Sequence, residues 1–169
     1  MQAEWIVVMG VSGCGKSTLG AAVADAVTLP MIEGDDFHSP ANVAKMSAGT
    51  PLTDEDRAGW LDTLGRQLAA HPRGAVLACS ALKRVYRERL RAAVPGLRFV
   101  FMALTPEEAQ RRVSARTEHM FPASLVANQF ATLESPVSEA GVFTVDATGP
   151  LAHLVAEVCA WVVEGPVSR

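Results

Sequence analysis

Five short stretches of the chain are apolar and almost free of charge. They lie at 5–9, 29–32, 75–79, 97–103 and 142–145. Runs of this kind are typical of buried strands in a parallel sheet. Between them, apolar residues recur at helical spacing, as Leu61, Leu64 and Leu68 do. The alternation predicts one α/β domain over 1–169, in which a five-stranded parallel sheet carries helices on both faces.

Three of the predicted helices begin at residues that commonly cap helices. Ser39-Pro40 joins a capping serine to a proline at the first helical position, and Thr53 precedes three acidic residues. Thr105 to Glu108 fits the pattern of a reciprocal capping box. The helical pattern that begins there is interrupted at 117–121 and resumes over 123–133.

The segment between the first strand and the first helix carries the clearest chemical signal. Residues 10–17 read Gly-Val-Ser-Gly-Cys-Gly-Lys-Ser, which matches the phosphate-binding P-loop. Its glycines let backbone N–H groups converge on a phosphate, while Lys16 reaches the β- and γ-phosphates and Ser17 ligates Mg²⁺. The flanking strand and helix argue against a glycine-rich turn that matches by chance. The predicted nucleotide-binding residues are Gly10, Val11, Ser12, Gly13, Cys14, Gly15, Lys16, Ser17 and Thr18.

A cluster of acidic residues follows the second predicted strand. The sequence reads Glu33-Gly-Asp35-Asp36-Phe-His38. Open α/β sheets bind ligands at the carboxyl ends of their strands, whereas a solvated polar turn is the alternative. If the strand continues through these residues, side chains alternate, so Glu33 and Asp35 face the site and Asp36 points away.

Composition limits the classes of function. The net charge of −3 argues against a general nucleic-acid-binding protein. Nine of the fifteen Lys and Arg residues lie between 83 and 116, which suits either an anionic ligand or a solvated helix face. No apolar run reaches the roughly 20 residues of a membrane span, and no signal-peptide pattern is recognisable. Cys14, Cys79 and Cys159 lack metal-binding spacing, so we expect a reduced, cytoplasmic protein.

Several segments together resemble the gluconokinase family. They are the P-loop, Gly-Asp-Asp-Phe-His at 34–38, residues 42–46 and 49–57, Cys-Ser-Ala-Leu-Lys at 79–83 with Tyr86-Arg87, Ala115-Arg116 with His119 and Phe121, and 129–134. The resemblance implies an adenylate-kinase-like P-loop NTPase core, a substrate-binding helical region at about 38–72 and a lid at about 112–135. It also implies ATP-dependent phosphorylation of D-gluconate at O6, and commonly a homodimer.

Some positions differ from the family pattern. Gly59 stands where the family usually has proline, Cys14 often appears as serine, and Thr117, Glu118 and Met120 differ in the lid. None of these differences removes a chemical group that we assign to catalysis.

The phosphate end of the predicted site needs cations, because phosphoryl transfer depends mostly on positioning and charge stabilisation. Lys16 supplies one, and Ser17 is the expected Mg²⁺ ligand with Glu33 acting through a water molecule. By resemblance, Arg116 is the lid arginine that closes on the phosphates and Arg112 lies over the adenine. Solvated helix arginines are the alternative for both.

The acceptor end needs a group to orient the hydroxyl and a cation for the carboxylate. Asp35 is the predicted catalytic carboxylate, and His38 either binds the polyol or is structural. We expect Arg57 to pair with the gluconate carboxylate in a bidentate manner, with Lys83 and Arg87 as further candidates. A salt bridge from Arg57 to Asp54 or Asp56 is the competing explanation.

Other interpretations of the motifs stay open. Another small acceptor, such as shikimate or a nucleoside monophosphate, is the main alternative substrate. A GTPase-type switch fits poorly, because Asp146 to Gly149 lies far from the P-loop and no guanine motif occurs. Cys14, beside Lys16 and a helix N-terminus, is predicted to be a reactive thiol unless it is too shielded. Trp60 is predicted to belong to the core.

Overall fold

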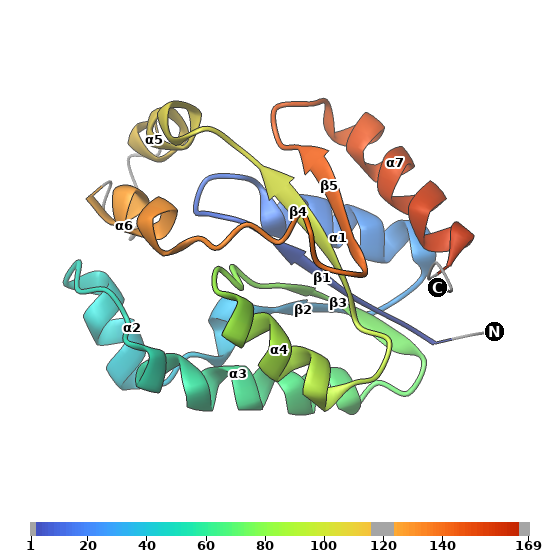
Figure 1. The fold of residues 1–169 in the computed structure, drawn as a ribbon, viewed down its shortest axis with the longest axis horizontal. Helices are drawn as coiled ribbons and strands as arrows, with labels where there is room; N and C mark the ends of the chain where they lie inside the picture. Colours follow the sequence, from blue (N-terminus) through green and yellow to red (C-terminus); the bar gives the residue numbers. More distant parts are fainter. Residues whose placement is uncertain (1–2, 116–123, 166–169) are drawn as a thin grey trace.

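The computed structural model describes residues 3–115 and 124–165, and the predicted parallel sheet is confirmed within them (Figure 1). The strands are β1 (Glu4–Met9), β2 (Met31–Glu33), β3 (Gly74–Ala78), β4 (Arg98–Ala103) and β5 (Val142–Asp146). Neighbours pair in parallel in the order β2-β3-β1-β4-β5. β1 is therefore central, with β3 on one side and β4 on the other.

Helices cover both faces of this sheet, as the sequence predicts (Figure 1). The main ones are α1 (Lys16–Val27), α3 (Asp54–Ala69), α4 (Arg84–Ala93) and α7 (Leu151–Glu164). Ile6 and Val8 of β1 pack toward α1 and α7, whereas Val7 and Met9 pack toward α3 and α4. All four side chains are fully buried. This two-sided burial explains why the strand is apolar throughout.

The carboxyl ends of three strands open at one edge of the sheet. β1 leads into the P-loop and α1, β2 leads into the short 3₁₀ helix η1 (Gly34–Phe37), and β3 leads to Ser80. Because the strands are parallel, all three connections meet at the same edge. Helix α2 (Pro40–Ser47) follows η1 and reaches the same end of the molecule (Figure 1).

The predicted helix caps are present, with one difference. The Ser39 hydroxyl accepts a hydrogen bond from the Asn42 N–H at 3.1 Å, and Thr53 forms a reciprocal capping box with Asp56.

Thr105 also caps its helix, but its predicted box is not reciprocal, because the Glu108 carboxylate accepts hydrogen bonds from Arg111 and Arg112 instead. Those bonds, chiefly from Arg111, lower the pKa of Glu108 to about 2.

Two helices, α5 (Pro106–Ser114) and α6 (Ser124–Thr132), pack together beside the P-loop (Figure 1). They share a small apolar cluster with Val11 of the P-loop. Much of the predicted lid at 112–135 falls in this region, although residues 116–123 lie outside the described part of the chain. Of the helices described, none is long and apolar enough to cross a membrane.

Candidate active site

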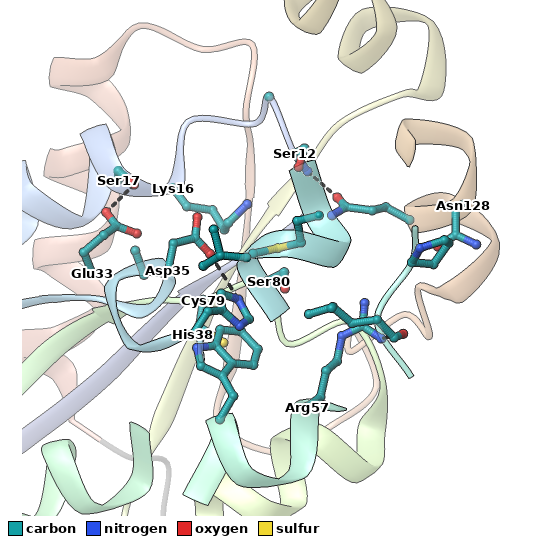
Figure 2. Close-up of a pocket in the computed structure, with 18 of the residues that line it drawn as sticks. Ser12, Lys16, Ser17, Glu33, Asp35, His38, Arg57, Cys79, Ser80 and Asn128 are labelled. Atoms are coloured by element: carbon teal, nitrogen blue, oxygen red, sulfur yellow. Dashed lines mark hydrogen bonds and ion pairs between the residues drawn. The ribbon is translucent and has the colours of Figure 1, made fainter. Parts of the chain in front are cut away.

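A cavity of about 610 Å³ lies at the carboxyl edge of the sheet. It is lined by the P-loop, the β2–η1 turn, α2 with the loop that follows it, the start of α3, the end of β3 and part of α6 (Figure 2). Segments far apart in the sequence therefore line one cavity. This is the location at which open α/β sheets bind their ligands.

The P-loop curls because two of its glycines have left-handed backbone angles. Gly13 has φ of 86° and Gly15 has φ of 96°, a region that side chains other than glycine rarely adopt. Six of the predicted nucleotide-binding residues line the cavity, namely Ser12, Gly13, Gly15, Lys16, Ser17 and Thr18. Lys16 Nζ donates a hydrogen bond to the Val11 carbonyl at 3.1 Å, which places the ammonium group across the loop.

The other predicted P-loop residues lie beneath the cavity surface. Val11 is 2% exposed and Cys14 is 1% exposed, and both belong to apolar clusters. The prediction of a reactive Cys14 thiol is not supported, because a reagent cannot reach a side chain packed in the core. A small residue that fits the loop is the better explanation for this position.

Ser17, at the start of α1, lies beside Glu33, at the end of β2. The Ser17 hydroxyl donates to Glu33 Oε2 at 2.5 Å, and both residues line the cavity beside Lys16 (Figure 2). A hydroxyl and a carboxylate are hard oxygen donors, which Mg²⁺ prefers. Since Mg²⁺ usually keeps several water and phosphate ligands, two protein donors here fit the predicted metal site.

Asp35 lines the cavity as predicted, but for a different reason. The chain does not continue as a strand after Glu33; it turns into η1, and the turn directs Asp35 toward the cavity (Figure 2). A Cβ atom on Gly34 would lie 2.6 Å from the Ala78 carbonyl oxygen, so only glycine permits this close approach. The Trp60 indole N–H donates to the Gly34 carbonyl at 2.8 Å and anchors the turn.

The His38 side chain is almost fully buried, and the residue also lines the cavity. Its ring stacks on Trp60 with centroids 4.1 Å apart, and only 3% of its side chain is exposed. Nε2 lies 3.7 Å from Asp35 Oδ1, and Nδ1 lies 3.4 Å from Asn42 Nδ2. Burial lowers the pKa of His38, so the ring is neutral at neutral pH. Trp60 is confirmed as a core residue, because it is 6% exposed.

Arg57 lines the cavity at the start of α3. Its Nη1 donates to the Leu52 carbonyl at 2.7 Å and to Tyr86 Oη at 3.2 Å. The competing salt bridges are not found, because Asp54 pairs with Lys83 at 2.9 Å and Asp56 pairs with Lys45 at 2.7 Å. Over the described residues, Lys16 and Arg57 are the two Lys or Arg residues in the cavity wall.

The Arg87 and Lys83 side chains do not line this cavity. Arg87 is fully buried, its guanidinium pairs with Glu139 at 2.5 Å, and it also donates to the carbonyl of Ala81 at 2.8 Å. Ala81 has φ of 47°, so the hydrogen bond from Arg87 supports a left-handed turn after β3. Arg87 therefore supports the loop after β3, and its burial does not favour the predicted contact with substrate. Lys83 lies outside the cavity and bonds Asp54.

Of the two arginines predicted to bind the nucleotide, Arg112 lies within the described residues. Arg112 Nη1 donates to the Gly13 carbonyl at 3.1 Å, and its Nη2 donates to the Ala147 carbonyl at 3.1 Å. Arg112 thus contacts the outside of the P-loop and is not a simple solvated arginine, while its contact with adenine stays a prediction. Arg116, the predicted lid arginine, lies outside the described residues.

The sequence interpretation missed several residues of the cavity wall. Ser80 follows β3, Thr50 precedes α3, and Asn128 and Gln129 extend from α6. Gln129 Oε1 accepts a hydrogen bond from the Ser12 N–H at 2.5 Å. Gln129 belongs to the 129–134 segment of the family resemblance, so a signal was present, although nothing in the local pattern points to a P-loop contact.

A P-loop at a helix N-terminus, an adjacent hydroxyl–carboxylate pair and a separate polar acceptor region define this chain as a P-loop kinase of small molecules. A family model described as an AAA domain matches residues 6–136. A gluconokinase from Gluconobacter oxydans is 46% identical over 86% of this chain and 83% of its own length. The thermoresistant gluconokinase of Escherichia coli is 36% identical over 94% and 93%.

Solved structures agree with these relatives. The crystal structure of a gluconokinase from Sinorhizobium meliloti has a TM-score of 0.88 and 47% identity, covering 95% of this chain and 92% of that one. An unliganded sugar kinase from Janibacter has a TM-score of 0.91 and 40% identity, covering 95% of both chains. The chain belongs to the gluconokinase family.

Proposed function

We propose that this protein phosphorylates D-gluconate at O6 with ATP and releases 6-phospho-D-gluconate and ADP. The observation that carries the proposal is the separation of two cations in one cavity wall. Lys16 lies at the P-loop beside Asp35, and Arg57 lies at the other side of the cavity (Figure 2). An acceptor that carries a carboxylate at one end and a primary hydroxyl at the other suits this arrangement.

At the phosphate end, the chain's own groups position the nucleotide. The P-loop N–H groups and the N-terminus of α1 bind the β- and γ-phosphates, and Lys16 neutralises charge on the transferred group. Ser17 would ligate Mg²⁺ directly and Glu33 would hold one of its water ligands. The metal, when bound, supplies further charge stabilisation to the phosphates.

At the acceptor end, Asp35 accepts a hydrogen bond from the O6 hydroxyl and directs it at the γ-phosphorus. The carboxylate takes the proton as the phosphoryl group transfers. Arg57 Nη1 is held by the Leu52 carbonyl and Tyr86, which fixes the guanidinium plane. With the plane fixed, the guanidinium binds the gluconate carboxylate. His38 is neutral and donates or accepts one hydrogen bond with the polyol.

The finer assignments come from the family resemblance. They are the substrate-binding region at about 38–72, the lid at about 112–135 with Arg116 closing on the phosphates, and assembly as a homodimer. A place in the cytoplasm is proposed separately, from the cysteine content of the chain. The contact between α6 and the P-loop supports a lid region that lies against the nucleotide site.

An acceptor panel tests the proposed function. ADP release should be fast with gluconate and negligible with shikimate or a nucleoside monophosphate, and phosphorus NMR should find the product phosphate on C6. Turnover that is faster with shikimate would instead assign the enzyme to the alternative class of acceptors.

A further inference from the structure

The peptide group that joins Val11 to Ser12 is hydrogen-bonded on both of its sides. Its carbonyl oxygen accepts from Lys16 Nζ at 3.1 Å, and its N–H donates to Gln129 Oε1 at 2.5 Å. Figure 2 draws the second bond as the dashed line at Ser12. One planar unit of the P-loop therefore connects the phosphate-binding lysine to helix α6.

The geometry of a peptide bond links these two contacts. In a planar trans peptide the C=O and N–H groups point in opposite directions. When the carbonyl of Val11 is directed toward Lys16, the N–H of Ser12 must point to the other side of the loop. Gln129 provides the acceptor on that side, so its amide favours the peptide orientation that holds Lys16 across the loop.

Helix α6 is itself fixed to the body of the protein. Just beyond its end, the Glu134 N–H donates to the Leu82 carbonyl at 2.8 Å. The Glu134 carboxylate accepts from the Arg84 N–H at 2.8 Å. Val126 of α6 is 2% exposed and belongs to the same apolar cluster as Val11. Helix α6, which carries Gln129, is thus held by packing beside the P-loop and by two hydrogen bonds of Glu134 just beyond its end.

We propose that Gln129 is a positioning residue for Lys16, acting through the Val11–Ser12 peptide. The inference rests on the proposed function only through the role of Lys16 in binding phosphates. It gives α6 a defined part in nucleotide binding: the helix sets the orientation of a P-loop peptide and hence the position of the lysine ammonium.

The test measures ADP and ATP affinity by titration calorimetry with no acceptor present. Gln129→Met keeps the length of the side chain and removes the acceptor, and it should weaken nucleotide binding about 10-fold, as expected for one lost hydrogen bond near a charged group. Thr132→Ala is the matched control, because it removes an exposed hydrogen bond within α6 and should leave affinity unchanged. KM for ATP should rise in Gln129→Met while KM for gluconate stays constant.

A double-mutant cycle shows whether the effect passes through Lys16. In a Lys16→Met background, Gln129→Met should change ADP affinity less than 2-fold. An equal loss in both backgrounds, or no loss in the single variant, overturns the inference. If Lys16→Met alone binds nucleotide as tightly as the wild type, the assignment of Lys16 to the phosphate site in the proposed function is contradicted as well. Melting temperatures of all variants establish that each protein is folded.

Discussion

Substitution of Asp35 by Asn tests the proposed orientation of the acceptor hydroxyl. The Asp35 side chain is 82% exposed, lines the cavity and lies 3.7 Å from the neutral His38 ring. The turn that carries it is anchored by Trp60 and by the close contact of Gly34 with β3, neither of which involves the Asp35 side chain. Asp35→Asn therefore removes a negative charge and a proton acceptor while leaving the supporting structure in place.

The expected changes in stability and turnover differ, because the Asp35 side chain does not hold the turn in place. Because the side chain is exposed, stability should change by no more than about 0.5 kcal/mol. Loss of a general base typically slows turnover by about 10²–10⁴-fold, which corresponds to about 2.7–5.4 kcal/mol in the activation barrier. The loss should appear in kcat rather than in either KM, because the lost interaction strengthens in the transition state.

Steady-state kinetics and thermal unfolding on the same purified sample separate catalysis from structure. Asp36→Asn is the matched control, because Asp36 is the exposed neighbour that does not line the cavity. Its kcat should match the wild type. A kcat of Asp35→Asn within a few-fold of wild type, together with a lower melting temperature, would show that Asp35 is a turn residue and would refute the reasoning.

Three further predictions follow from the cavity wall. Arg57→Ala should raise KM for gluconate about 30-fold or more and leave KM for ATP unchanged. Arg57→Lys should recover only part of the gluconate affinity, because the planar fork of the guanidinium is lost. A KM for gluconate equal to that of the wild type in both variants would contradict this prediction. Glu33→Gln should lower activity at low Mg²⁺ and be partly rescued at high Mg²⁺, whereas a loss independent of Mg²⁺ would exclude a metal role. Since burial lowers the pKa of His38, the unfolded chain binds the extra proton below about pH 6.5. The melting temperature should therefore fall between pH 7.5 and 5.5 more steeply in the wild type than in His38→Gln, and parallel curves would contradict this.

Local signals predicted much of the fold from the sequence. The P-loop and the caps at Ser39 and Thr53 depend on residues a few positions apart, so their geometry is encoded in short segments. The apolar strands could be recognised because both faces of the sheet are covered. The hydrophobic pattern could not predict the order of the strands in the sheet, because that order depends on contacts between distant segments.

Long-range packing also explains where the sequence interpretation of the site differs from the structure. Arg87 looks like a surface cation on a basic helix, but Glu139, 52 positions away, pairs with it in the interior. Gln129 has no local feature that points to Ser12, which lies 117 positions away. Asp35 reaches the cavity through a turn that depends on Gly34 meeting β3, a contact that alternation along a strand does not describe.

The ratio of kcat/KM for gluconate to that for sorbitol tests the central claim most directly. Both acceptors present a primary hydroxyl to Asp35, but sorbitol has no carboxylate for Arg57. A neutral acceptor leaves the guanidinium without its anionic partner, which we expect to cost several kcal/mol and to give a ratio of about 10³ or more. A ratio near one would contradict the assignment of Arg57 and the choice of gluconate as the acceptor.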